Sequence, residues 1–124
     1  MVAERRRVGP VEAIPENGCV LVRLGQVEVG VFKVRGVLRA YLNRCAHQGG
    51  PVCQGEIVPR YEEEIGPGGE SLGVRASATR LDIACPWHGW EYDLMTGENI
   101  ADRRYRLRAV PVSVEEGIVY LEVP

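Results

Sequence analysis

Cys45-Ala46-His47-Gln48-Gly49-Gly50-Pro51 and Cys85-Pro86-Trp87-His88-Gly89-Trp90 are the two stretches around which this sequence is organised. Each stretch places one thiol close to one imidazole, and together they use both histidines of the chain. Two sulfur and two nitrogen donors suit a tetrahedral zinc ion, or an iron–sulfur centre in which two histidines replace two cysteines on one iron. The glycines allow positive φ angles, so that peptide N–H groups could point at sulfur. We therefore predict a metal site built from two loops.

Length and composition favour a single domain with no affinity for nucleic acid or membranes. The chain has 124 residues and a formal net charge of −2, whereas nucleic acid requires a basic face. No apolar run approaches the roughly 20 residues that a membrane span needs. Arg5-Arg6-Arg7 is followed by prolines and glutamates rather than an apolar signal region, so we expect a solvated tail and a cytoplasmic location.

The rest of the sequence is typical of short β-strands separated by glycine turns. Alternating apolar residues predict strands at 19–24, 27–34, 37–42, 52–58, 80–84, 91–94, 109–114 and 118–123. A change of face at Phe32 and Val34 suggests a β-bulge in the second strand. No helix longer than a turn or two is expected. The pattern predicts an all-β, antiparallel sandwich or barrel.

Residues 59–80 interrupt this pattern. They contain Glu62-Glu63-Glu64 and Gly66-Pro67-Gly68-Gly69, with weak periodicity and high polarity. We interpret them as a surface insertion of about 20 residues between the two ligand loops, a length at which loops are often functional or mobile. The acidic run is either a solvated surface or a docking patch. The arginines at 103, 104, 106 and 108 leave the same choice, between an exposed strand edge and a site for an acidic partner.

The two stretches, followed by Tyr92-Asp93, resemble the Rieske [2Fe–2S] domain, and the resemblance covers most of the chain. It implies a Rieske-type antiparallel β-sandwich with a cluster-binding subdomain of two ligand loops, formed as one domain over residues 1–124. It also implies that Cys45 and Cys85 bind one iron of a single [2Fe–2S] cluster, and that His47 and His88 bind the other. In this family the outer edges of the histidines lie near solvent, where an electron would leave.

Residues beside the ligands distinguish the branches of the family. The respiratory-chain branch has a disulfide at the places of Gly50 and Trp87, and a serine that donates to a bridging sulfide at the place of Trp90. Tyr92 matches a family tyrosine whose hydroxyl reaches a ligating sulfur. The residues expected beside the ligands are therefore Gln48, Gly50, Trp87, Trp90 and Tyr92. Fewer donors to sulfur stabilise the reduced cluster less, so we expect a potential of roughly −150 to 0 mV.

The expected function is electron transfer, with no catalytic residue in this chain. A terminal oxygenase needs a second iron held by two further histidines and a carboxylate, and no histidine remains here. The resemblance implies a ferredoxin that takes electrons from a flavin-dependent NAD(P)H reductase and delivers them to a ring-hydroxylating terminal oxygenase. The alternatives are a small Rieske subunit or regulatory module of a larger redox enzyme, and a zinc-stabilised binding module.

Cys19 and Cys53 lie outside both stretches. As small residues in apolar segments they are expected to be buried hydrophobes, although they could pair with each other or, for Cys53, tune the metal site.

Overall fold

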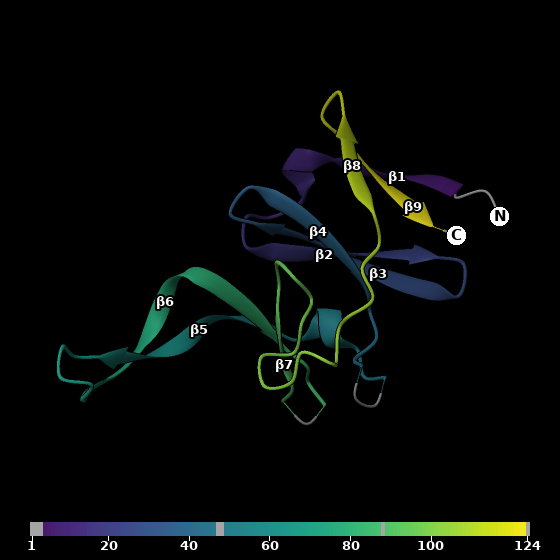
Figure 1. The fold of residues 1–124 in the computed structure, drawn as a ribbon. Coiled ribbons are helices and arrows are strands. Elements are labelled where there is room, and N and C mark those ends of the chain that lie inside the picture. Colours follow the sequence, from purple (N-terminus) through teal and green to yellow (C-terminus); the bar gives the residue numbers. More distant parts are fainter. Residues whose placement is uncertain (1–3, 47–48, 88, 124) are drawn as a thin grey trace.

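The computed structural model describes residues 4–46, 49–87 and 89–123, which form mainly β-strands (Figure 1). The strands are β1 (Glu4–Pro10), β2 (Gly18–Leu24), β3 (Val27–Val34), β4 (Val37–Leu42), β5 (Glu56–Ile65), β6 (Ser71–Ala84), β7 (Glu91–Asp93), β8 (Val112–Glu115) and β9 (Ile118–Val123). They pair as three antiparallel sheets, in the orders β1-β9-β8, β2-β3-β4 and β5-β6-β7. The prediction of an all-β antiparallel fold is confirmed.

Helical structure in the described ranges is limited to two short 3₁₀ segments. These are η1 (Val11–Ala13) and η2 (Val52–Gln54). No helix in this part of the chain is long and apolar enough to cross a membrane. The strand predicted at 52–58 is therefore partly wrong, because η2 takes up its first half and β5 begins only at Glu56.

The β2-β3-β4 sheet follows the predicted strands closely. Arg35 and Gly36 have φ angles of 49° and 79°, which makes the tight turn between β3 and β4. The predicted bulge in β3 is wrong, since its pairing with both neighbours continues without a register shift. The change of face arises because β3 is buried on both sides. Val29 and Val31 enter one hydrophobic core, and Phe32 enters the other.

These two cores divide the molecule. The terminal core joins the sheet that holds both chain ends to β3 and contains Ile14, Val29, Val31, Ala40, Val110, Val119 and Leu121. The loop-side core contains Phe32, Val34, Tyr41, Cys45, Val52, Cys53, Ile83, Cys85, Tyr92, Leu94 and Leu107. Cysteines from both predicted ligand loops therefore belong to one core, although the loops follow strands of different sheets.

The N-terminal arginines lie in a strand rather than in a solvated tail. Their side chains are exposed, as expected, but the backbone of β1 pairs with β9. Arg5 forms an ion pair with Glu115 at 2.8 Å, and its guanidinium lies 4.0 Å from the centre of the Tyr120 ring. An exposed edge strand and a solvated tail can have the same polar composition, because backbone pairing does not require apolar side chains.

Residues 59–80 form most of a long hairpin of β5 and β6, which projects from the rest of the molecule (Figure 1). We call residues 60–80 the arm. The arm consists of two paired strands joined by a turn at residues 66–70, rather than the loop that weak periodicity suggested. Register shifts occur between Pro59 and Tyr61 and between Glu63 and Ile65. Each shift interrupts the alternation of side chains, which explains why the pattern was weak.

The arm exposes large apolar side chains as well as charged ones. Tyr61 lies on one face with Glu63 by the period of two, Ile65 lies beyond the second register shift, and Val74 joins Tyr61 through its pairing with Glu63. These three apolar side chains are 66%, 57% and 69% exposed. The charged side chains include Arg75 and Glu64, which form an ion pair at 3.9 Å.

A buried ion cluster joins the base of the arm to the remainder of its sheet. Arg60 donates from Nε and Nη2 to Asp82, with a shortest distance of 2.7 Å, and from Nη2 to Asp93 at 2.9 Å. The Asp82 residue is fully buried. The oxygen Oδ1 of Asp93 also accepts the backbone N–H of Met95 at 2.7 Å. The cluster thus connects β5, β6 and the turn after β7.

Candidate metal centre

The first ligand loop follows β4 and is closed by two backbone hydrogen bonds. The N–H of Cys45 donates to the carbonyl of Gly50 at 2.8 Å, and the N–H of Gly49 donates back to the carbonyl of Cys45 at 2.9 Å. Gly49 has a φ angle of 75°, in the left-handed region that favours glycine. These two bonds hold the backbone of Cys45 close to that of Gly49 and Gly50.

The second ligand loop follows β6 and repeats the same arrangement. The N–H of Cys85 donates to the carbonyl of Trp90 at 2.7 Å, and the N–H of Gly89 donates to the carbonyl of Cys85 at 3.2 Å. Gly89 has a φ angle of 68°. Both bonds join residues at the same spacing as in the first loop. The described parts of the two loops therefore share one hydrogen-bond pattern, in which Cys45 and Cys85 take equivalent positions.

The two cysteine side chains meet in the loop-side core. Cys45 and Cys85 are 4% and 2% exposed, and burial raises the pKa of the Cys85 thiol. The two thiols lie close enough for Cys45 to contribute to this raised pKa, while the backbone N–H of Trp87 donates to the Cys85 sulfur and opposes the rise. A metal that binds both sulfurs would displace their protons and form metal–sulfur bonds in their place.

Tyr92 supplies a further donor to the sulfur pair. Its hydroxyl lies 3.1 Å from Sγ of Cys45, and the residue is fully buried in β7. Burial, together with the hydrogen bond to Cys45, raises the pKa of Tyr92 above its ordinary value. The phenol therefore stays protonated and can donate to the sulfur.

The loops also pack directly against each other. Gly50 is buried, and a methyl group added to it would lie 2.8 Å from Cγ and Cδ2 of Trp87. Trp87 remains 51% exposed. Trp90 is half-buried and meets Tyr105 edge to face, with the ring centres 5.1 Å apart. Gly50 and Trp87, the places of the disulfide in the respiratory-chain branch, are thus in van der Waals contact here.

His47, Gln48 and His88 lie outside the described residues. Within the described ranges there is accordingly no group of three or more potential metal ligands. The two adjacent, buried thiols, with N–H and O–H donors beside them, fit the two cysteine ligands of one iron in a [2Fe–2S] site. Hydrogen bonds to sulfur stabilise the reduced state of such a cluster. The assignment of the four ligands stays a prediction.

The other two cysteines are free thiols. Cys53 is buried over Gly30, where an added methyl group would lie 2.6 Å from its Sγ. Burial raises the pKa of the Cys53 thiol to about 12 and that of Cys19 to about 11. Such thiols remain protonated and unreactive at neutral pH, as expected for packing residues.

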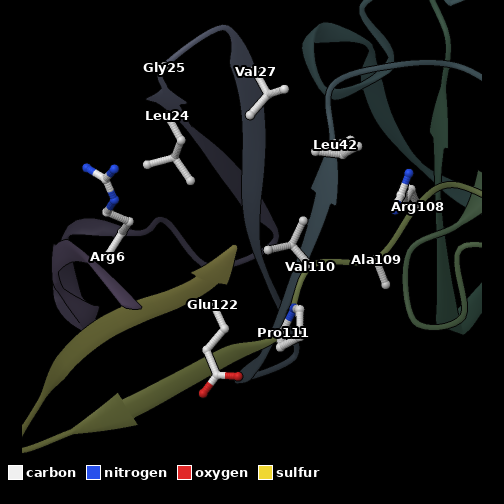
Figure 2. Close-up of a pocket in the computed structure, with 10 residues that line it drawn as sticks. All are labelled: Arg6, Leu24, Gly25, Val27, Leu42, Arg108, Ala109, Val110, Pro111 and Glu122. Atoms are coloured by element: carbon white, nitrogen blue, oxygen red, sulfur yellow. The ribbon is translucent and has the colours of Figure 1, made fainter. Parts of the chain in front are cut away.

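Surface hollows lie beside the end of β4, where the first ligand loop begins. One, of about 300 Å³, is lined by Leu42, Arg44, Cys45, Ala46, Arg106 and Arg108. Figure 2 shows another, of about 510 Å³, lined mainly by the apolar residues Leu24, Val27, Leu42, Val110 and Pro111, with Arg6, Arg108 and Glu122. Neither loop cysteine lines this second hollow. Sequence reasoning did not single out Arg44, although its position next to Cys45 was a usable signal.

The chain is similar to known proteins in sequence pattern and in structure. The family model of the Rieske [2Fe-2S] domain matches residues 4–111. A Mycobacterium tuberculosis protein assigned as the small subunit of an NADH-dependent nitrite reductase has a similar structure, with a TM-score of 0.71, 18% identity and coverage of 100% of this chain and 98% of that one. The Nocardioides aromaticivorans ferredoxin of carbazole 1,9a-dioxygenase gives a TM-score of 0.65 and 18% identity, with 100% and 99% covered.

A ferredoxin from Sphingomonas yanoikuyae has a TM-score of 0.66 and 20% identity, over 98% of this chain and all of that one. None of the curated proteins compared matches the sequence. At these identities the structural likeness establishes the fold, and the family match establishes the kind of domain.

Proposed function

Because the chain belongs to the Rieske [2Fe–2S] domain family, we propose that it carries single electrons from a flavin-dependent NAD(P)H reductase to a ring-hydroxylating oxygenase. The family carries a [2Fe–2S] cluster, which accepts and releases one electron when bound. The chain is therefore an electron-transfer protein. The reductase and the oxygenase are the proposed part.

In this proposal Cys45 and Cys85 hold one iron, and His47 and His88 hold the other. The observation that carries it is the close approach of two buried thiols, at equivalent positions of two loops that share one hydrogen-bond pattern. Tyr92 and the N–H of Trp87 donate to these sulfurs and favour the more negative, reduced state. The surrounding core excludes water from the sulfur pair.

The oxygenase partner is supported by likeness to ferredoxins of dioxygenase systems. One similar chain was solved in a complex of reduced oxygenase and oxidised ferredoxin of carbazole 1,9a-dioxygenase, with a TM-score of 0.67 and 20% identity. The second candidate, a small subunit of a larger redox enzyme, is supported by likeness to the nitrite reductase subunit and to Escherichia coli NirD, which gives a TM-score of 0.67. Stable co-purification with a large subunit would favour this second function.

The test is anaerobic purification followed by potentiometric titration and EPR spectroscopy. A Rieske signal with a midpoint of roughly −150 to 0 mV is expected for an oxygenase carrier. His88→Cys should retain some iron and lose the Rieske signal. Protein that holds zinc and has no reducible centre would refute electron transfer, and an unchanged spectrum in His88→Cys would refute the ligand assignment.

A further inference from the structure

We propose that arginines around the first ligand loop form a docking surface for an acidic face of the redox-partner protein. The central feature is the hollow of about 300 Å³ beside Cys45, which we call the arginine cavity. Arg44, Arg106 and Arg108 line it together with Cys45 itself. Three cationic side chains therefore line the same hollow as Cys45, one of the proposed iron ligands. This inference rests on the proposed function.

A further hollow, different from the one in Figure 2, extends this surface toward the second ligand loop. It has a volume of about 550 Å³ and shares Leu42 and Arg44 with the arginine cavity. Its lining also includes Arg23, Gly49 and the exposed Trp87. Arginine and tryptophan beside apolar residues are the composition found at the centres of protein–protein interfaces. The surface thus touches both ligand loops.

The charge of this surface is largely uncompensated. Among the described residues, Arg44 and Arg108 form no ion pair, and both are exposed. Arg106 reaches Glu98 at 3.2 Å, and Glu28 is the one acidic residue that lines either hollow in this part of the structure. Guanidinium groups in such a position favour carboxylate partners, which they can bind through two parallel hydrogen bonds.

The arm carries charges of both signs. Its four glutamates (Glu62, Glu63, Glu64 and Glu70) lie with Arg60, Arg75 and Arg80, so its formal net charge is −1, whereas the arginine cavity is lined by three arginines and, among the described residues, no acidic one. Figure 1 shows the arm projecting away from the ends of the ligand loops. The arginine cavity is therefore more positive than the arm, so an acidic partner is attracted to the side of the ligand loops rather than to the arm.

A macromolecular probe tests the surface without a known partner. Binding of poly-L-glutamate to the holoprotein is measured by titration calorimetry from roughly 0.01 to 0.5 M ionic strength. The variant Arg44→Glu/Arg108→Glu is compared with Arg75→Glu/Arg80→Glu, which makes the same change of charge on the arm. We expect affinity to fall about tenfold or more in the first variant at low salt, with less than about a twofold change in the second.

Electron transfer provides the second readout. Oxidation of the reduced protein by anionic hexacyanoferrate(III) should be slowed several-fold in Arg44→Glu/Arg108→Glu, and oxidation by the cationic tris(phenanthroline)cobalt(III) should be accelerated. Both effects should vanish at high salt. The visible spectrum checks that the cluster is retained. If the charge reversal prevents cluster assembly, Arg44→Gln/Arg108→Gln is used in its place. This neutral variant should give smaller changes in the oxidation rates, of the same sign.

Equal effects in the two double variants would overturn the proposal. So would binding of free glutamate or phosphate without binding of the polymer, since the cavity would then be a small-anion site. Calorimetric binding does not require a reducible cluster. A zinc-containing protein that still binds the polymer through these arginines would therefore refute the electron-transfer function while leaving the acidic-partner surface in place.

Discussion

Replacement of Tyr92 by phenylalanine isolates the hydroxyl that lies 3.1 Å from Sγ of Cys45. The ring occupies a fully buried position that phenylalanine can fill, so the change removes one donor and little packing. A reduced cluster carries more negative charge on its sulfurs and accepts this hydrogen bond more strongly than an oxidised one. The substitution should therefore lower the reduction potential.

The size of the shift follows from the strength of the bond. A hydrogen bond to a charged group contributes about 1.5–3 kcal/mol, and both oxidation states accept it, so we assign about 1 kcal/mol to the difference between them. For a one-electron couple a tenfold change in the equilibrium constant, about 1.4 kcal/mol, corresponds to about 59 mV. Tyr92→Phe should lower the midpoint by about 40 mV.

Tyr41→Phe is the matched control. Tyr41 is also buried, at 1% exposure, but its hydroxyl donates to the carbonyl of Leu94 at 2.7 Å. Both substitutions should reduce the free energy of unfolding by about 1 kcal/mol, as measured with urea. Only Tyr92→Phe should move the potential in a spectroelectrochemical titration. A shift of equal size in both variants, or none in Tyr92→Phe, would refute the assignment of this hydroxyl to the sulfur.

Three further substitutions test the loops, the base of the arm and a buried thiol. Gly50→Ala should cost about 1–3 kcal/mol in urea unfolding, because its methyl group would lie 2.8 Å from the Trp87 ring; Trp87→Ala in the same chain should restore stability. Arg60→Ala should cost about 3–5 kcal/mol by the same assay, since buried Asp82 loses its main partner, and a cost below about 1 kcal/mol would contradict this. Cys53 keeps its proton in the folded state to a pKa of about 12, against 9.0 for a free thiol. Its contribution to the free energy of unfolding is thus complete below about pH 9 and is lost as pH rises towards 12, at up to about 1.4 kcal/mol per pH unit. Because Cys19 also titrates in this range, the slope should be smaller in Cys53→Ala than in the parent protein rather than absent.

The sequence was informative wherever side-chain alternation and turn residues agree. β2, β3, β4 and β9 lie close to their predicted positions, because period-two burial and glycine turns determine both their face and their ends. The arm was missed as strand because its register shifts break that period. β1 was missed because only its backbone pairing with β9, and not its exposed arginines, makes it part of a sheet.

For the site, the sequence predicted the loops and the involvement of Tyr92. It could not predict that the loops share one hydrogen-bond pattern, or that Gly50 packs against Trp87, because these are contacts between segments far apart in the chain. The convergence of Arg44 with Arg106 and Arg108 was hidden for the same reason. The ligand prediction rests on residue types and spacing, whereas the surface that a partner meets depends on tertiary structure.

The burial of β3 on both faces bears on how the protein unfolds. Val31 packs into the terminal core and Phe32 into the loop-side core, so neither core can open without disturbing a strand that the other needs. The two halves should therefore unfold as one cooperative unit, and the amides of β3 should be among the slowest in the chain to exchange with solvent. A substitution in a ligand loop that destabilises the loop-side core should therefore also destabilise the terminal core, because β3 contributes side chains to both.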